Sequence, residues 1–235
     1  MALHTQDRPS DSPYIARVWR GHSSGVHRMT SVATSHWELV VWTHRGRTHA
    51  ALRGPETAAS TAAVPDDSAS LGISFAHGVS LPHLPMPRLV DRQLDSPHAD
   101  AHTFVLAGTR RPLPTFDDAE EFVARLVRDN VLVRDPLVAE ALGGETPRVS
   151  ARTLQRRVAA ATGLTPSAIR QIDRARQAAV LLGEGAAPLD VTHRLGYYDQ
   201  PHLARSLRRF IGRTATQLRR TDPAQPLSLL YKTHT

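Results

Sequence analysis

The spacing of apolar residues changes near residues 107–114, and this change constrains the fold more than any other feature of the sequence. Before it, short apolar stretches alternate with polar residues and are interrupted by glycines and prolines, which is typical of strands joined by turns. After it, apolar residues recur every three or four positions, as in helices. We therefore predict an α+β chain, with a mostly-β domain over residues 14–110 and an all-α domain over residues 115–221.

The first thirteen residues, MALHTQDRPSDSP, are polar and lack the apolar stretch of a secretion signal. We expect residues 1–13 to form a disordered leader. No run of about 18 apolar residues occurs in the chain, so we expect no transmembrane helix and no membrane partner. The expected localisation is cytoplasmic.

Positive charge is concentrated in the C-terminal half. The chain has a formal net charge of +7, and residues 148–220 contain 14 arginines and 4 acidic residues, a net charge of +10. Residues 1–114 contain 11 basic and 9 acidic residues, a net charge of only +2. The distribution predicts an acidic partner for the helical domain. The chain has no cysteine, which excludes disulfides, thiolate zinc sites and cysteine nucleophiles.

Capping residues divide the helical domain into about seven short helices. Asp, Ser or Thr precedes several of the predicted helices, proline occupies some first turns, and glycine follows several last turns. The longest predicted helix runs from Pro166 to Gly183 or Gly185, after the cap Thr165, and would be a rod of roughly 27 Å. The caps and stops expected before it are Asp135, Gly143, Ser150 and Gly163.

Two of the predicted helices share one pattern, cap-x-x-x-Leu-x-Arg-x-apolar. One copy begins at Ser150 and the other at Asp199. Each follows a short helix and a turn that contains glycine. The leucine and the apolar residue four positions later lie on one helix face and are expected to pack on the preceding helix. The pattern therefore predicts two similar units, each with a second helix that turns a polar face outward.

The outward face of each second helix carries arginine and glutamine. Arginine can pair with guanine and glutamine with adenine in the major groove, and a helix-turn-helix presents its second helix in this way. Solvated arginines are also ordinary on helix surfaces, so contact with phosphate or with no ligand remains an alternative for each. The candidate base contacts are Arg152, Gln155, Arg156, Gln200, Pro201 and Arg205. The candidate phosphate contacts are Arg157, His202, Arg208 and Arg209.

The stretch GYYDQPHLARSLRRFIGRT, residues 196–214, resembles the signature of the AraC/XylS family of bacterial transcription regulators. The resemblance covers about residues 115–221 and is strongest over 150–218. It implies two helix-turn-helix units joined by the long helix, with the recognition helices in successive major-groove segments about 34 Å apart. It places base contacts at the same six positions and makes double-stranded DNA the partner.

The sequence departs from the family pattern at four places. The turn GGETPRVS, residues 143–150, is longer than usual. Val158 stands where phenylalanine is common, Thr192 replaces a small alanine, and Ala215 replaces a proline. The second unit therefore follows the family more closely than the first.

The N-terminal region resembles, more weakly, the β-rich domains of some AraC-type regulators. The resemblance implies that it binds a small-molecule effector, dimerises, or both; further candidate partners are RNA polymerase and a second copy of the chain. A cupin-like barrel is the expected architecture. Such barrels can hold a metal through histidines, but the nine histidines within residues 14–110 are scattered, so we expect no metal and no cofactor. They are His22, His27, His36, His44, His49, His77, His83, His98 and His102.

Two other functions stay open at this point. The N-terminal region could be a small-molecule or metal binding module with weak or architectural DNA contact, or a cupin-type enzyme fused to a helical tail. No phosphate loop, dinucleotide fingerprint or nucleophile elbow occurs in the sequence. We therefore expect a sequence-specific transcription regulator rather than an enzyme.

Overall fold

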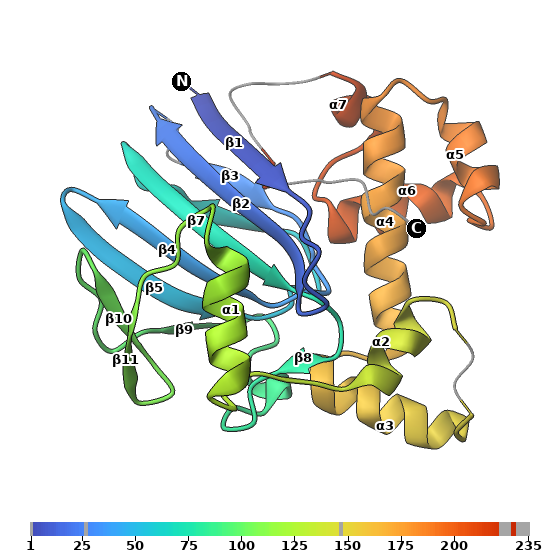
Figure 1. Cartoon of the computed structure of the whole chain (residues 1–235). Coiled ribbons are helices and arrows are strands. Elements are labelled where there is room, and N and C mark those ends of the chain that lie inside the picture. The colour runs from blue at the N-terminus through green and yellow to red at the C-terminus, as the bar shows by residue number, and fades with distance from the viewer. Residues whose placement is uncertain (1, 26–27, 146–147, 221–226, 229–235) are drawn as a thin grey trace.

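The computed structural model describes residues 2–25, 28–145, 148–220 and 227–228. Strands dominate the chain up to Pro112 and helices dominate it from Ala119 onward (Figure 1). The predicted α+β class, with a mostly-β region followed by a helical region, is confirmed. None of the helices in the described ranges is long and apolar enough to cross a membrane.

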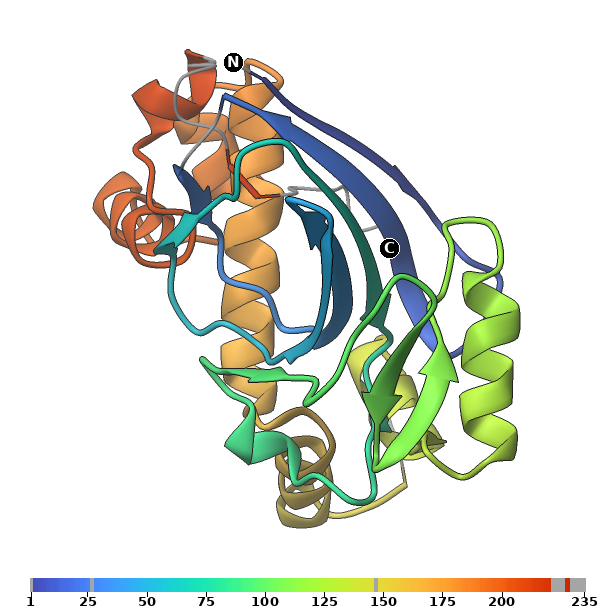
Figure 2. The same cartoon turned by 90° about the vertical axis from the view of Figure 1, so that its left-hand side faces the viewer.

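A curved antiparallel sheet forms the centre of the N-terminal region (Figure 2). One hairpin of this sheet turns at Arg45 and Gly46, which both have positive φ angles, as a tight two-residue turn requires. The strands lie in the order β1 (Ala2–Arg8), β2 (Ile15–Ser24), β7 (Ser68–Phe75), β4 (Glu38–His44), β5 (Arg47–Arg53) and β9 (Gln93–Asp95).

Three two-stranded sheets and one 3-10 helix complete the β-rich region. The helix η1 is Met86–Arg88. The strand pairs are β3 (Arg28–Ser31) with β6 (Ser60–Ala63), β8 (Val79–Ser80) with β12 (Val133–Arg134), and β10 (Thr103–Leu106) with β11 (Thr109–Pro112).

The two faces of the large sheet differ in chemistry because side chains alternate along each strand. On one face, Leu39, Ile73 and Phe75 are buried in an apolar core. Helix α1 (Ala119–Arg128) covers this core with Phe122, Val123 and Leu126. The opposite face carries serines, glycines, charged residues and two tryptophans, and lies toward the helical region.

The predicted boundary between the two domains differs from the structure. We placed residues 115–134 in the helical domain, but α1 packs into the core of the β-rich region, together with Phe116, Val131 and Leu132. The helical period of α1 was predicted correctly, while its packing partner was not. The spacing of apolar residues indicates that a helix has an apolar face, but it does not indicate which core that face packs into.

The predicted disordered leader is also wrong. Ala2–Arg8 form β1, which pairs antiparallel with β2 from Ala2↔Ser24 to Arg8↔Val18. The backbone of an edge strand is held by hydrogen bonds to its neighbour, so a polar sequence can form it. Arg8 also binds both carboxylate oxygens of Glu120 on α1, at 2.6 and 2.7 Å.

Six helices follow, and most of their ends lie at the predicted residues. The side chains of Asp135, Ser150, Thr165 and Asp199 each accept a backbone N–H in the first turn. Thr146 and Pro147, within the long turn before Ser150, lie outside the described residues. The helices are α2 (Pro136–Leu142), α3 (Ala151–Thr162), α4 (Pro166–Gly183), α5 (Pro188–Arg194), α6 (Gln200–Phe210) and α7 (Ala215–Arg219).

A second apolar core holds these helices together. Helix α4 supplies Ile169, Ile172 and Leu182, and residues of α3, α5 and α6 pack around it. Val32 and Ala33 from the β-rich region are buried in the same core. The helical region is therefore in direct contact with the β-rich region, which lies beside α4 in Figures 1 and 2.

Candidate nucleic-acid interface

Helix α6 separates its apolar and polar residues onto two faces. Leu203, Leu207 and Phe210 are buried, as predicted from their spacing. Gln200, Pro201 and Arg205 are exposed on the opposite side. The Asp199 carboxylate accepts the His202 N–H at 2.6 Å, which fixes the first turn. The predicted outward face of α6 is thus a continuous exposed surface at its N-terminal half.

A buried tyrosine, Tyr197, lies in the turn between α5 and α6 and contacts α6. The Tyr197 hydroxyl lies 3.2 Å from the Ser206 hydroxyl, and burial raises the pKa of Tyr197. The Arg174 guanidinium of α4 lies over the Tyr197 ring at 4.4 Å and donates to the Gly196 carbonyl at 3.3 Å. These contacts fix the turn between α5 and α6 on α4.

Helix α3 presents the corresponding positions of the first predicted unit. Arg152, Gln155 and Arg156 are exposed, whereas Val158 is fully buried and Leu154 is half-buried. The Ser150 hydroxyl accepts the Thr153 N–H at 3.2 Å, and Gly163 ends the helix with a φ of +75°. The half-buried Leu154 corresponds to the buried Leu203 of α6, so α3 is packed less deeply at this position.

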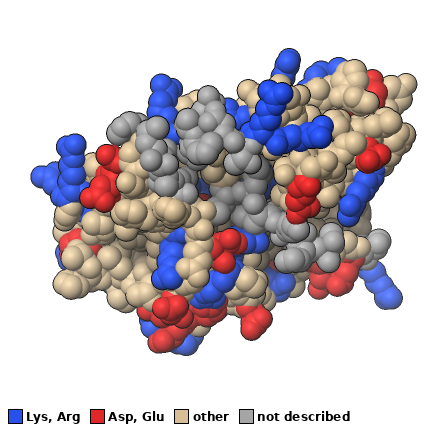
Figure 3. All heavy atoms as spheres, turned by 90° about the horizontal axis from the view of Figure 1, so that it is seen from above, with Lys and Arg blue, Asp and Glu red and all other residues tan. Residues whose placement is uncertain are grey.

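Several exposed arginines of α3 and α6 have no carboxylate partner among the described residues. Within the part of the chain that the structure describes, no ion pair is formed by Arg152, Arg156, Arg205 or Arg208. Four arginines of the β-rich region, by contrast, are paired with carboxylates: Arg8 with Glu120, Arg17 with Asp7, Arg110 with Asp100 and Arg111 with Asp129. Basic side chains project from the helical region at the right of Figure 3. The two helices therefore offer positive charge to an external anion.

Three of the four predicted phosphate contacts have partners within the chain. The Arg157 guanidinium donates to the Asp135 carboxylate at 2.8 Å. The Arg209 guanidinium lies 4.9 Å from the centre of the Phe210 ring. The Nδ1 of the half-buried His202 accepts the Tyr198 N–H at 3.5 Å, which leaves Nε2 as the donor nitrogen of the neutral ring. Arg208 is exposed and unpaired among the described residues.

One exposed aromatic residue beside α6 was missed in the sequence. Tyr198 is 92% exposed and immediately precedes the Asp199 cap. A tyrosine in this position can contact a phosphate through its hydroxyl. The packing of α5 against α6 determines that Tyr197 is buried and Tyr198 is exposed.

The C-terminal end of α6 is fixed to the β-rich region. The backbone N–H of Ala33 donates to the Phe210 carbonyl at 2.7 Å, and that of Ala59 donates to the Arg209 carbonyl at 2.8 Å. The Ala33 carbonyl in turn accepts from the buried Arg176 of α4 at 2.8 Å. One short segment of the β-rich region therefore contacts both the long helix and α6.

Residues 146–221 match the family model of a helix-turn-helix domain. The match covers α3 to α7 and supports an AraC-type helix-turn-helix, in the region where the sequence resembles that family. The helical region thus carries a DNA-binding helix-turn-helix domain. Comparisons with curated proteins and with solved structures gave no match.

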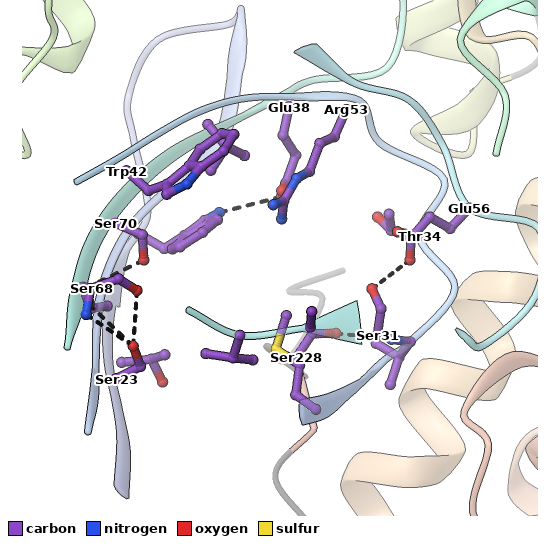
Figure 4. A pocket seen from close by; sticks show the side chains of 18 of the residues that line it. Ser23, Ser31, Thr34, Glu38, Trp42, Arg53, Glu56, Ser68, Ser70 and Ser228 are labelled. Carbon is purple, nitrogen blue, oxygen red and sulfur yellow. Dashed lines mark hydrogen bonds between the residues drawn. The ribbon is translucent and has the colours of Figure 1, made fainter. Parts of the chain in front are cut away.

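The inner face of the large sheet forms a pocket of about 340 Å³ (Figure 4). Its floor consists of small residues, including Gly21, Ser23, Ser68 and Ser70, and its walls carry Trp19, Trp42, Glu38 and Arg53. The antiparallel pair of β3 and β6 contributes to its wall, and Glu56 and Arg176 line the side toward the helical region. None of these residues was predicted as a site residue.

A sequence signal for this pocket exists in the strand alternation. In SASLGISF, residues 68–75, serines and a glycine alternate with Ala69, Leu71, Ile73 and Phe75. The side chains of serine and glycine are too small to fill a core. A sheet face that carries them therefore leaves room for a ligand or for residues that cover it. In ELVVW, residues 38–42, the glutamate and the tryptophan lie on that same face.

Two of the scattered histidines meet at the boundary between the regions. The rings of His36 and His77 stack with centroids 4.1 Å apart, and His77 Nε2 lies 3.0 Å from the Ser35 hydroxyl. The Ser35 hydroxyl donates to the Asp173 carboxylate of α4 at 2.9 Å. Burial lowers the pKa of both histidines and raises that of Asp173. Across the described residues, no three His, Asp or Glu side chains gather as metal ligands.

Proposed function

We propose that this chain is a sequence-specific transcription regulator of the AraC/XylS type. In this proposal α2–α3 and α5–α6 are two helix-turn-helix units joined by α4, and α3 and α6 read the major groove. Arg152, Gln155 and Arg156 on α3, and Gln200, Pro201 and Arg205 on α6, contact bases. The N-terminal region senses a ligand or mediates dimerisation. The proposal assigns no catalytic reaction to the chain.

One observation carries this proposal: both helices bury one side in a shared core and leave unpaired arginines on the other. An unpaired guanidinium at the outer face of a helix-turn-helix can pair with guanine or phosphate without breaking an internal ion pair. The match to the helix-turn-helix family model spans both helices, which supports the proposal. The alternative, an architectural DNA binder, predicts the same positive charge but no base preference.

Selection of binding sites from a random DNA pool by the full chain tests the proposal. We expect a consensus of two short boxes separated by about one helical turn, because α4 joins two reading helices. A single box would contradict base reading by α3. Binding with a steep salt dependence but without an enriched sequence would favour the architectural alternative.

The pocket in the β-rich region supports the sensing part of the proposal rather than the dimerisation part. A concave site with a few polar groups on a rigid sheet is the usual form of a small-molecule site. Its volume of about 340 Å³ is within the range of such sites.

A further inference from the structure

The pocket on the inner face of the sheet contains four charged side chains, and they differ in how they are paired. Arg53 donates from Nε to the Gln93 side chain at 3.0 Å, and Arg176 donates to the Ala33 carbonyl at 2.8 Å. Glu38 and Glu56 accept hydrogen bonds on one carboxylate oxygen each. Among the described residues, Glu38 Oε2 and Glu56 Oε1 have no hydrogen-bond partner. Each carboxylate therefore keeps one oxygen available for an N–H donor of a ligand.

The two carboxylates act on each other inside the pocket. Glu56 is half-buried, and its Oε2 accepts from the Ser31 hydroxyl at 2.7 Å. Burial raises the pKa of Glu56, and the negative charge of Glu38 raises it further. The Ser31 hydroxyl and the charge of Arg53 lower the pKa of Glu56, but the net shift is upward. A further cation bound between the two carboxylates relieves both the burial and the repulsion.

An aromatic face lies beside Glu38. The indole of Trp19 lies flat on Gly72, where an added Cβ would come within 2.1 Å of Trp19 Cε2. One face of the ring is thus covered by the sheet and the other is turned to the pocket that Trp19 lines. The Trp19 indole N–H points at the Glu38 carboxylate at 3.4 Å. An aromatic face next to a carboxylate is the arrangement that recognises organic cations.

We propose that this pocket binds a small organic ammonium ion, with its charged group held by Glu38 and Glu56 and its carbon skeleton against Trp19. The small residues of the floor, Gly21 and Ser70 among them, provide the space for that skeleton. Arg53 and Arg176 stay in their existing hydrogen bonds and border the site.

The pocket is connected to α6 through residues 31–34, and this second step rests on the proposed function. Glu56 and Thr34 exchange two backbone hydrogen bonds, of 2.9 and 3.1 Å. The neighbouring Ala33 binds both the Phe210 carbonyl and Arg176. A ligand that binds Glu56 therefore acts on a segment that is hydrogen-bonded to the C-terminal end of α6. We expect an ammonium ligand to change the affinity for DNA by about fivefold or more.

Tryptophan fluorescence of the full chain tests the site, because two of its three tryptophans line the pocket and Trp37 is buried elsewhere. The probes are phenethylammonium, the neutral 2-phenylethanol and the anionic 3-phenylpropionate. We expect phenethylammonium to bind with a Kd on the order of 1 mM or below, and the other two at least about tenfold more weakly. Equal binding of the alcohol, tighter binding of the anion, or no phenethylammonium binding up to about 10 mM would overturn the proposal.

Isosteric variants locate the binding. Glu38→Gln and Glu56→Gln should each weaken phenethylammonium binding at least about tenfold and leave the circular dichroism spectrum unchanged. Glu121→Gln on the exposed side of α1 removes the same charge far from the pocket and should bind like the unmodified chain. Equal binding by all three variants would overturn the site.

Titration of the selected DNA with and without phenethylammonium tests the connection to α6. If the probe binds the pocket but DNA affinity stays the same, the connection is wrong and the site stands. If the probe binds while no DNA sequence is selected, the proposed function is wrong and the site still stands.

Discussion

The backbone N–H of Ala33 donates a 2.7 Å hydrogen bond to the carbonyl oxygen of Phe210, the last residue of α6. Carbonyls at the C-terminal end of a helix have no partner within the helix, so a donor from elsewhere in the chain satisfies this one. Ala59 does the same for the Arg209 carbonyl at 2.8 Å. The β-rich region thus determines how the proposed reading helix α6 is oriented on the rest of the molecule.

Arg176→Met should weaken the contact between the two regions. Arg176 is 5% exposed and its guanidinium donates to the Ala33 carbonyl, so the substitution leaves a buried acceptor without its charged donor. We expect the free energy of unfolding to fall by about 1.5–3 kcal/mol, measured by urea denaturation. Arg170→Met on the exposed side of α4 is the matched control, with an expected change within about 0.5 kcal/mol. Equal changes in both variants would show that the contact with Ala33 contributes nothing.

Arg205→Ala should reduce both affinity and base preference. A bidentate contact to guanine contributes about 1–3 kcal/mol, so binding to the selected consensus should weaken about tenfold to hundredfold. The preference at one base position should disappear when site selection is repeated. Arg156→Ala should act in the same way on the second box. Arg47→Ala, in the exposed turn of the β4–β5 hairpin, removes the same charge and should change affinity less than about twofold. A loss that is equal for every DNA sequence would reassign Arg205 to phosphate.

Arg208→Ala should weaken DNA binding without changing its sequence preference. Arg208 is exposed on α6 and forms no ion pair within the described ranges, and its predicted role is a phosphate contact. Each phosphate contact releases about one counterion, so a plot of log Kd against log salt concentration should become shallower by about one unit. An unchanged salt slope together with a changed consensus would make Arg208 a base contact instead.

Glu120→Gln should loosen β1. Arg8 holds the pKa of Glu120 down to about 2 by donating to its carboxylate. Because the folded-state pKa is lowered, the stabilisation is present above the unfolded value of about 4.5 and is lost as the pH falls toward 2. Both side chains are partly exposed, so we expect a loss of only about 1 kcal/mol at pH 7.

Hydrogen exchange of the β1 amides gives a direct measurement of this effect. Exchange should speed up in Glu120→Gln at pH 7, and in the unmodified chain below about pH 4 relative to the trend of other strands. Glu121→Gln breaks the exposed pair with Arg125 on the same helix and should leave β1 unaffected. Unchanged protection of β1 in Glu120→Gln would show that strand pairing alone holds it.

Much of the helical region could be predicted from the sequence because its signals are local. The caps Ser150, Thr165 and Asp199 each accept an N–H three residues further along the chain. The faces of α6 follow from a period of 3.6 residues, and Leu203, Leu207 and Phe210 are buried as that period requires. Gly163 has the positive φ expected of a residue that ends a helix.

Packing between distant segments could not be predicted in this way. β1 pairs with β2, and Arg8 contacts Glu120 on α1. The polar composition of residues 1–13 does not predict either contact. Helix α1 carries a clear apolar face, yet only the tertiary structure assigns it to the core under β2 rather than to the helices that follow it.

The sequence by itself determined that strands precede helices, where the helices end, which faces of α3 and α6 point outward and that arginine is concentrated there. Each of these depends on residues within a few positions of one another. Only the tertiary structure decided that Glu38, Glu56 and Trp19 share a pocket and that Ala33 caps α6. These features depend on which strands pair and in which register, because a one-residue shift in a strand turns each side chain to the opposite face.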